Sequence, residues 1–263
     1  MIKYVLLFFA LTSSFICYPA SSVSTIIFKS SWVVSKVDIN NLTERTLSYQ
    51  SNDDRLVGRY ISFDTNSITS NLPETINFQQ PQYKSTISSI DSLIHEAMGG
   101  ADSASAKAYD LEVDGKKNIP VLNLSCHVGS FGGGDTGKNS WIGFPDNKKM
   151  LVNWFDGTIL TLVPVSSNAK PEPSFSCAKA YTPTEKTICS DYNLSSFDKS
   201  VNKAWKSAQH GAISVGDQAL EEKIKNSQKA WIKTRNSCET DKECLNKSMV
   251  ERLNVLSSIT DGQ

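Results

Sequence analysis

Apolar side chains recur at helical spacing along residues 174–258. Each of three segments places an apolar or aromatic residue every three or four positions, which gives a helix one apolar stripe. The stripes are Leu194, Phe197, Val201 and Trp205; then Leu220, Ile224 and Trp231, with the polar Gln228 on the same face; and then Leu245, Met249, Leu253 and Leu256. Because each stripe has to be buried against the others, the pattern predicts a small all-helical bundle.

Two sequences in this region predict helix starts. Thr182-Pro183-Thr184-Glu185 has the form of a capping box with proline at the first helical position. Ser214-x-x-Asp217 predicts the start of the helix that carries Leu220.

Residues 23–163 show a different pattern, made of short runs rich in Val, Ile, Tyr, Phe and Trp. These runs are "SSWVVSKVDI", "RYISFD", "IPVLNLSCHV" and "KMLVNWFDGTILTLV". In the third run, period two places Leu122, Leu124 and Cys126 on one face of a strand. Asp156-Gly157 predicts a hairpin turn, and "PDNKK" (145–149) predicts a second turn.

One helix interrupts these predicted strands. "SSIDSLIHEAMGG" places Ile90, Leu93, Ile94 and Met98 at helical spacing and then stops at two glycines. We therefore expect an α+β protein. Its N-terminal domain is mainly antiparallel β, a curved or partly closed barrel with one helix packed on it, and its C-terminal domain is a disulfide-stapled helical bundle.

The N-terminus has the layout of a secretory signal peptide. Lys3 precedes an apolar run and then small residues, which predicts cleavage after Ser22, with Ala20 as the alternative. Cys17 suggests a lipoprotein, but the bulky Phe15 and Ile16 before it argue against lipidation. No second apolar run of about eighteen residues follows, so we expect a periplasmic chain with no transmembrane segment.

"PVSSNAKPEPS" (164–174) is rich in proline and serine and is typical of a linker. The predicted organisation is a signal peptide at 1–22, a β-rich domain at 23–163, a linker at 164–173, a helical domain at 174–258 and a tail at 259–263.

Charge and cysteine content narrow the possible functions. The formal net charge is +0, which argues against a nucleic-acid partner. Export favours disulfides among the five cysteines beyond the signal, which are Cys126, Cys177, Cys189, Cys238 and Cys244. The last four bracket the first helix and the last interhelix turn, and their three possible pairings stay open. Five is odd, so one thiol is free or pairs with another chain.

Motifs for chemistry are weak throughout. "GGGDTGKN" (132–139) resembles a P-loop, but Asn139 replaces the hydroxyl that should meet magnesium. Cys126 and His127 are neighbours in a strand and therefore point to opposite faces. His95-Glu96 lacks the second histidine of a metalloprotease helix. We expect no catalysis, no cofactor and no metal site.

The glycine-rich segment "GSFGGGDTGKNS" (129–140) is the candidate partner-binding loop, because polar, flexible loops reach into concave partner surfaces. The candidate residues are Ser130, Phe131, Gly132, Gly133, Gly134, Asp135 and Lys138.

Four stretches of the C-terminal region carry a recognisable pattern, namely "FSCAKAYTPTEKTICSD", "LSSFDKSVNKAW", "SQKAWIKTRNSC" and "CLNKSMVERL". Through these stretches the region resembles the LprI-type lysozyme-inhibitor domain. The resemblance implies structural disulfides at Cys177, Cys189, Cys238 and Cys244, and signature positions at Gln228, Trp231 and Arg235. The N-terminal region also looks like a β domain that precedes this module, in which a cysteine near residues 77–83 would pair with Cys126. This chain has none there, so we expect Cys126 to be a free thiol.

Export, cysteine stapling and the resemblance together predict a periplasmic binding protein that inhibits a peptidoglycan hydrolase such as a lysozyme by occluding it. The alternatives are an immunity protein against a secreted cell-wall toxin, a small-ligand carrier if the barrel holds a cavity, and an envelope enzyme with an unrecognised site in the β domain.

Overall fold

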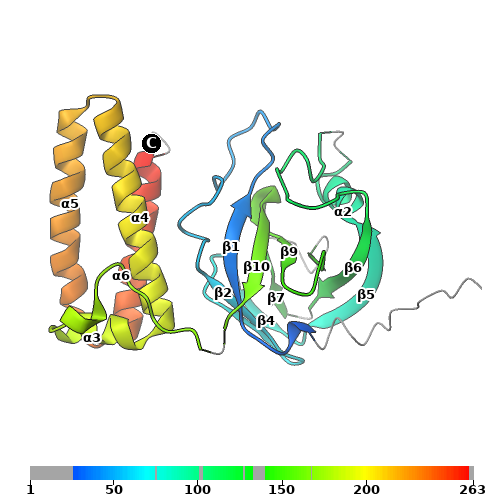
Figure 1. The fold of residues 1–263 in the computed structure, drawn as a ribbon, viewed down its shortest axis with the longest axis horizontal. Helices are drawn as coiled ribbons and strands as arrows, with labels where there is room; N and C mark the ends of the chain where they lie inside the picture. The colour runs from blue at the N-terminus through cyan, green and yellow to red at the C-terminus, as the bar shows by residue number, and fades with distance from the viewer. Residues whose placement is uncertain are drawn as a thin grey trace, which may run out of the picture.

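The structure is a computed structural model that describes residues 26–74, 76–100, 103–126, 128–132, 140–166 and 168–260. The predicted signal peptide and its cleavage site lie outside these residues. Two parts of the described chain have separate hydrophobic cores. We call them the β unit (residues 26–166) and the helical unit (residues 174–260) (Figure 1).

The β unit is built mainly from ten strands and the α-helix α2. They are β1 (Trp32–Asp38), β2 (Tyr60–Phe63), β3 (Ile68–Ser70), β4 (Ile76–Gln79), β5 (Gln82–Ser89), α2 (Ile90–Ala97), β6 (Asn118–Ser125), β7 (Val128–Ser130), β8 (Trp141–Gly143), β9 (Met150–Asn153) and β10 (Ile159–Pro164). Eight strands form one sheet in the order β3-β2-β1-β10-β9-β8-β6-β5, and β4 pairs with β7 separately. All the pairings are antiparallel, and the large sheet curls into a half-barrel (Figure 1).

The predicted hairpin turn joins β9 to β10. Asp156 and Gly157 both have left-handed backbone conformations, with φ of 56° and 71°. A side chain at Gly157 would also come within 2.9 Å of Met98 Sδ, so glycine fits this position for two reasons. The predicted helix is α2, which Ser89 caps at its N-terminus and which is followed by Gly99 and Gly100 in left-handed conformations.

The sheet packs on both faces. One cluster fills the concave side and contains Leu122 and Leu124, with Cys126 packed against it, as period two predicted. The alternating residues Ile119 and Val121 belong to a second cluster, which α2 and the segment 104–111 complete on the other face. Large side chains such as Trp154 and Phe131 fill the concave side, so the half-barrel holds a packed core where a ligand carrier would hold its ligand.

The helical unit contains α3 (Pro183–Ser190), α4 (Tyr192–Ser214), α5 (Gln218–Asn236) and α6 (Lys242–Thr260), preceded by a short 3₁₀ turn η3 (Cys177–Lys179). The capping box at Thr182 and Glu185 is formed in both directions. The predicted start at Ser214 is wrong, because α4 continues through Ser214 and Asp217 caps α5 instead. Helix α6 reaches Thr260, beyond the predicted boundary of 258.

The predicted stripes form the bundle core, which also takes in Ile188 of α3 and three alanines of α4. Trp205 and Trp231 are only half-buried and pack at its margin. The mixed α+β architecture therefore confirms the predicted fold class.

Candidate protein-binding site

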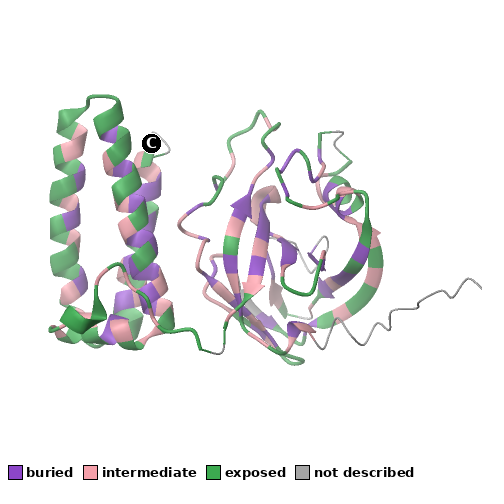
Figure 2. Ribbon diagram, viewed as in Figure 1, coloured by how far each residue is buried: buried purple, intermediate pink, exposed green. Residues whose placement is uncertain are grey.

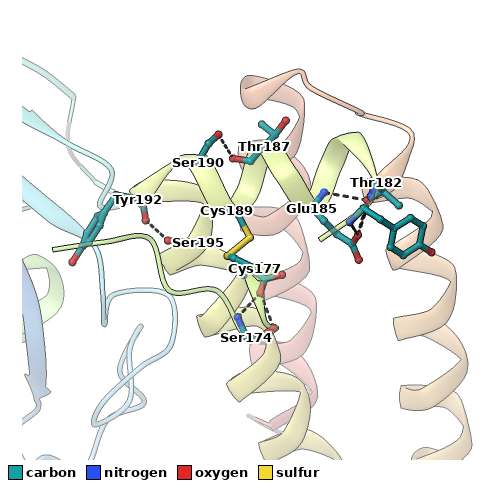
Figure 3. The surroundings of a disulfide bond; sticks show 11 residues. Ser174, Cys177, Thr182, Glu185, Thr187, Cys189, Ser190, Tyr192 and Ser195 are labelled. Atoms are coloured by element: carbon teal, nitrogen blue, oxygen red, sulfur yellow. Dashed lines mark hydrogen bonds between the residues drawn. A yellow bond between two sulfur atoms is a disulfide. The ribbon is translucent and has the colours of Figure 1, made fainter. Parts of the chain in front are cut away.

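The helical unit is closed at one end by two disulfides. Cys177 is joined to Cys189 and Cys238 to Cys244, which selects one of the three pairings that the sequence left open. The first bond ties η3 to the last turn of α3, as Figure 3 shows. The second closes the turn between α5 and α6. The four cysteines therefore act as crosslinks of the bundle.

Glu185 fixes the start of α3 near the first disulfide. Its carboxylate accepts hydrogen bonds from the backbone N–H groups of Thr182 and Tyr181, each at 3.1 Å (Figure 3). The bond from Thr182 is the main cause that lowers the pKa of Glu185 below its ordinary value.

Arg235 and Asp198 form a buried ion pair between α5 and α4. Arg235 Nη1 lies 3.1 Å from Asp198 Oδ1, and both side chains are more than nine-tenths buried. Asp198 Oδ2 also accepts bonds from the backbone N–H and the hydroxyl of Ser174. Burial lowers the pKa of Arg235, and the charge of Asp198 opposes that effect. The pair joins the segment before α3 to both long helices.

The other two signature positions hold α5 against α6. Trp231 Nε1 donates to the backbone oxygen and the hydroxyl of Ser248, both at 3.1 Å. Gln228 Oε1 accepts a hydrogen bond of 2.9 Å from Nε of the buried Arg252. The Arg235 guanidinium also lies over the Trp231 ring, 5.2 Å from its centroid. All three signature residues therefore fix helix to helix, and they form the floor of a groove.

This groove runs between α4 and α5 and has a volume of about 470 Å³, within the range of binding pockets. We call it the α4–α5 groove. Trp205 and Trp231 line it together with Phe175 and Ile232, and Ile232 is 38% exposed. Lys225 and Lys229 stand at its rim on α5. The groove thus combines apolar and aromatic surface with lysines at its rim, and the carboxylates of Glu185 and Asp198 also line it.

The opposite side of the bundle is covered by the β unit. Helix α4 lies between α5 and the half-barrel (Figure 1). Lys203 pairs with Asp54 at 2.9 Å, and the side chains of Asn193 and Asn71 are hydrogen-bonded to each other. Ser196 Oγ donates to the backbone oxygen of Gly58 at 2.7 Å. These contacts leave α5 as the long helix farthest from the β unit, with its exposed residues outward (Figure 2).

At the centre of the covered side, Arg59 is fully buried. Its guanidinium lies over the Phe197 ring, 3.5 Å from the centroid, and Nη2 donates to the hydroxyls of Ser196 and Ser200. Its Nε and Nη1 have no hydrogen-bond partner in the part of the chain that the structure describes. Burial lowers the pKa of Arg59 to about 9. This cation is held by packing, by the two hydroxyls and by the backbone oxygen of Val57, with no direct carboxylate partner among the described residues.

The residues of the candidate loop at 129–140 differ in burial. Phe131 and Gly132 are buried, and the Phe131 ring contacts Trp154, so neither offers a contact surface. Ser130 ends β7 and is half-buried. The remaining candidates Gly133, Gly134, Asp135 and Lys138 lie outside the described residues, as does the P-loop position Asn139.

Cys126 is a half-buried free thiol, and burial raises its pKa. Its neighbour His127 lies outside the described residues. Within the described ranges, no group of three or more His, Cys, Asp or Glu side chains is placed to hold a metal ion. No helix there is long and apolar enough to cross a bilayer.

Sequence reasoning missed several residues of these polar contacts. Asp198 carries a signal, because it stands in the "LSSFDKSV" stretch of the resemblance and interrupts an otherwise apolar face. Arg252 and Arg59 carry none, because an arginine in a helix or loop is mostly exposed.

Comparison with known families gives one result. Residues 177–261 match the family described as Lysozyme inhibitor LprI. The match covers the helical unit, so that unit is similar to the LprI domain, as the sequence resemblance predicted. It supports a lysozyme-inhibitor-type protein. No curated protein and no solved structure matches the chain.

Proposed function

We propose that this protein is a periplasmic inhibitor of a peptidoglycan hydrolase such as a lysozyme, which it blocks by binding and without catalysis of its own. The family match to residues 177–261 carries the proposal. Two disulfides support it, because such bonds persist in oxidising compartments. We also propose the domain organisation given above, with a cleaved signal peptide, a β-rich domain and a helical domain.

A binding inhibitor needs a rigid surface more than it needs reactive groups. Ordering flexible side chains on binding costs about 0.5–1.5 kcal/mol for each long side chain, so a preformed surface binds more tightly. The buried Asp198–Arg235 pair and the two disulfides supply such rigidity in the helical unit. The covered side of α4 contacts the β unit, so we propose that a partner contacts the other side of the bundle, at the α4–α5 groove.

The test is a titration of the chain from residue 23 onward against a panel of peptidoglycan hydrolases. Clearing of a peptidoglycan suspension is followed by turbidity. We expect at least one hydrolase to slow at micromolar inhibitor, with the wall suspension itself unchanged. Undiminished clearing by every muramidase, amidase and peptidase on the panel would overturn the proposal.

A further inference from the structure

The outer side of α5 carries a row of lysines. Lys225, Lys229 and Lys233 follow one another at intervals of four residues and all are exposed. Residues four apart on a helix are neighbours, so the three ammonium groups form one positive ridge. We call it the lysine ridge. Two of its lysines, Lys225 and Lys229, also stand at the rim of the α4–α5 groove.

The ridge is poorly neutralised by the chain itself. Lys225 pairs with Glu221, but Lys229 and Lys233 form no ion pair with any residue that the structure describes. By contrast, Lys199, Lys203 and Lys242 each have a carboxylate partner. The helical unit as a whole has thirteen Lys and Arg against ten Asp and Glu, a net charge of +3. An unpaired positive ridge beside a groove attracts a negatively charged partner surface.

Apolar surface lies next to this charge. Ile232 is 38% exposed between Lys229 and Lys233 in sequence, and it lines the groove with Trp205 and Trp231. Aromatic and aliphatic groups at the centre with charges around them are the composition of binding hot spots. A helix with such a face fits a concave partner surface, in the way amphipathic helices lie in grooves.

We infer that the lysine ridge binds the acidic cleft of a glycan-cleaving hydrolase, with Lys229 and Lys233 directed at its two catalytic carboxylates. This inference rests on the proposed function and narrows its target. Enzymes that cleave glycosidic bonds place a pair of Asp or Glu side chains about 5–9.5 Å apart in an open cleft. Successive ridge lysines are about 6 Å apart along the helix axis, from a rise of 1.5 Å per residue, which matches that separation. Zinc-dependent amidases bind a metal ion through their His and carboxylate ligands, so their cleft offers the ridge no equivalent free pair of carboxylates.

The experiment compares single and combined Lys→Gln variants at 225, 229 and 233 with wild type. Lys223→Gln is the matched control, because Lys223 is an exposed lysine of the same helix and does not line the groove. The readout is the inhibition constant for a muramidase and the dissociation constant for the same enzyme with one catalytic carboxylate changed to its amide. All these substitutions are on the surface, so the variants are expected to fold as wild type does.

We expect the triple variant to inhibit at least tenfold more weakly and the control variant to match wild type. Raising the salt from about 50 to 500 mM weakens wild-type inhibition, because ions screen exposed charges. Changing the catalytic carboxylate of the enzyme to its amide should weaken binding of wild type. The same change should weaken binding of Lys229→Gln less, because this variant has already lost the ion pair with that carboxylate.

The outcomes separate the two proposals. If wild type inhibits no hydrolase at all, the proposed function fails. If wild type inhibits a muramidase but the triple variant inhibits it equally well, the lysine-ridge inference fails and the proposed function stands. Equal inhibition of a zinc amidase by wild type likewise overturns the inference alone.

Discussion

The two sides of the helical unit use positive charge in opposite ways. On the side against the β unit, Arg59 is buried over Phe197 and hydroxyl groups surround it. On the far side, Lys229 and Lys233 are exposed without an ion-pair partner among the described residues, and Lys229 lines the α4–α5 groove. The covered side contacts complementary groups of the same chain. The two lysines of the far side have no such partner among the described residues. This difference is the reason why we propose the far side as the surface that a second molecule binds.

The bundle interior lies between the two sides. Disrupting its buried ion pair is expected to have the largest effect on the free energy of unfolding. Asp198→Ala leaves Arg235 buried without its partner, which is expected to lower the free energy of unfolding by about 3–5 kcal/mol. Urea unfolding of the whole chain, followed by far-ultraviolet circular dichroism, measures it. The double variant Asp198→Leu with Arg235→Met should lose clearly less, because no charge then stays unpaired. An equal loss in both variants would assign the effect to packing.

Removing the disulfides should have the next largest effect. Changing both Cys177 and Cys189 to Ser is expected to lower the free energy of unfolding by about 2–4 kcal/mol. The Cys238–Cys244 bond closes a loop of 6 rather than 12 residues, so its removal should lower that free energy less. Unfolding of each serine pair in urea gives the comparison. The reverse order would mean that local strain, and not chain entropy, decides the contribution of each bond.

Arg59→Met tests whether the buried cation on the covered side stabilises the protein. Methionine keeps apolar packing over Phe197 and removes a buried cation, and both serine hydroxyls retain backbone acceptors at Gly58 and Val57. We expect the free energy of unfolding at pH 7 to rise by about 1 kcal/mol. A fall of that size would show that the guanidinium hydrogen bonds hold the two units together.

The same variant predicts a pH dependence. Burial lowers the pKa of Arg59 to about 9, below its ordinary value, so above that pH the folded chain binds fewer protons than the unfolded chain. The stability of wild type should therefore rise relative to Arg59→Met as the pH increases through 9. The advantage of methionine is full below pH 9 and shrinks above it. Thermal unfolding of both proteins between pH 7 and 10 measures the difference.

The smallest effect is expected at Glu185. Its pKa is lowered mainly by the backbone N–H of Thr182, so the folded chain gains stability above the ordinary glutamate pKa and loses it as the pH falls through the lowered value. Glu185→Gln should lower the free energy of unfolding by less than about 1 kcal/mol at pH 7 and by nothing at pH 2. A difference that persisted at pH 2 would contradict the electrostatic explanation.

Much of the fold is predictable from sequence because local signals agree with tertiary structure. The capping box, the Asp156-Gly157 turn and the helical stripes are short-range patterns, and the structure confirms each of them. Ser214 was misplaced because Ser and Asp both cap helices, and only the chain path shows that Asp217 is the cap. The strand order was beyond reach because pairing partners lie far apart in sequence, as β1 and β10 do.

The candidate site is less predictable. Residues such as Gln228 and Arg235 stood out by resemblance, but their partners Arg252 and Asp198 come from other helices. The glycines around Phe131 predict that it lies on a flexible binding loop. That prediction is wrong for Phe131, because its ring is buried in the core of the β unit. The lysines of α5 carry no signal, because exposed lysines are common on every helix.

Both disulfides lie at the same end of the helical unit, near α3 and the α5–α6 turn (Figure 1). The turn between α4 and α5 at the other end has no crosslink, and Ile213 and Val215 there are exposed. We therefore expect local opening of the bundle to start at that turn and to proceed toward the crosslinked end. Amide protons near Val215 should exchange with solvent first, and those beside Ile188 last. Such an opening would widen the end of the groove that is nearer the α4–α5 turn, while the residues of its floor stay packed.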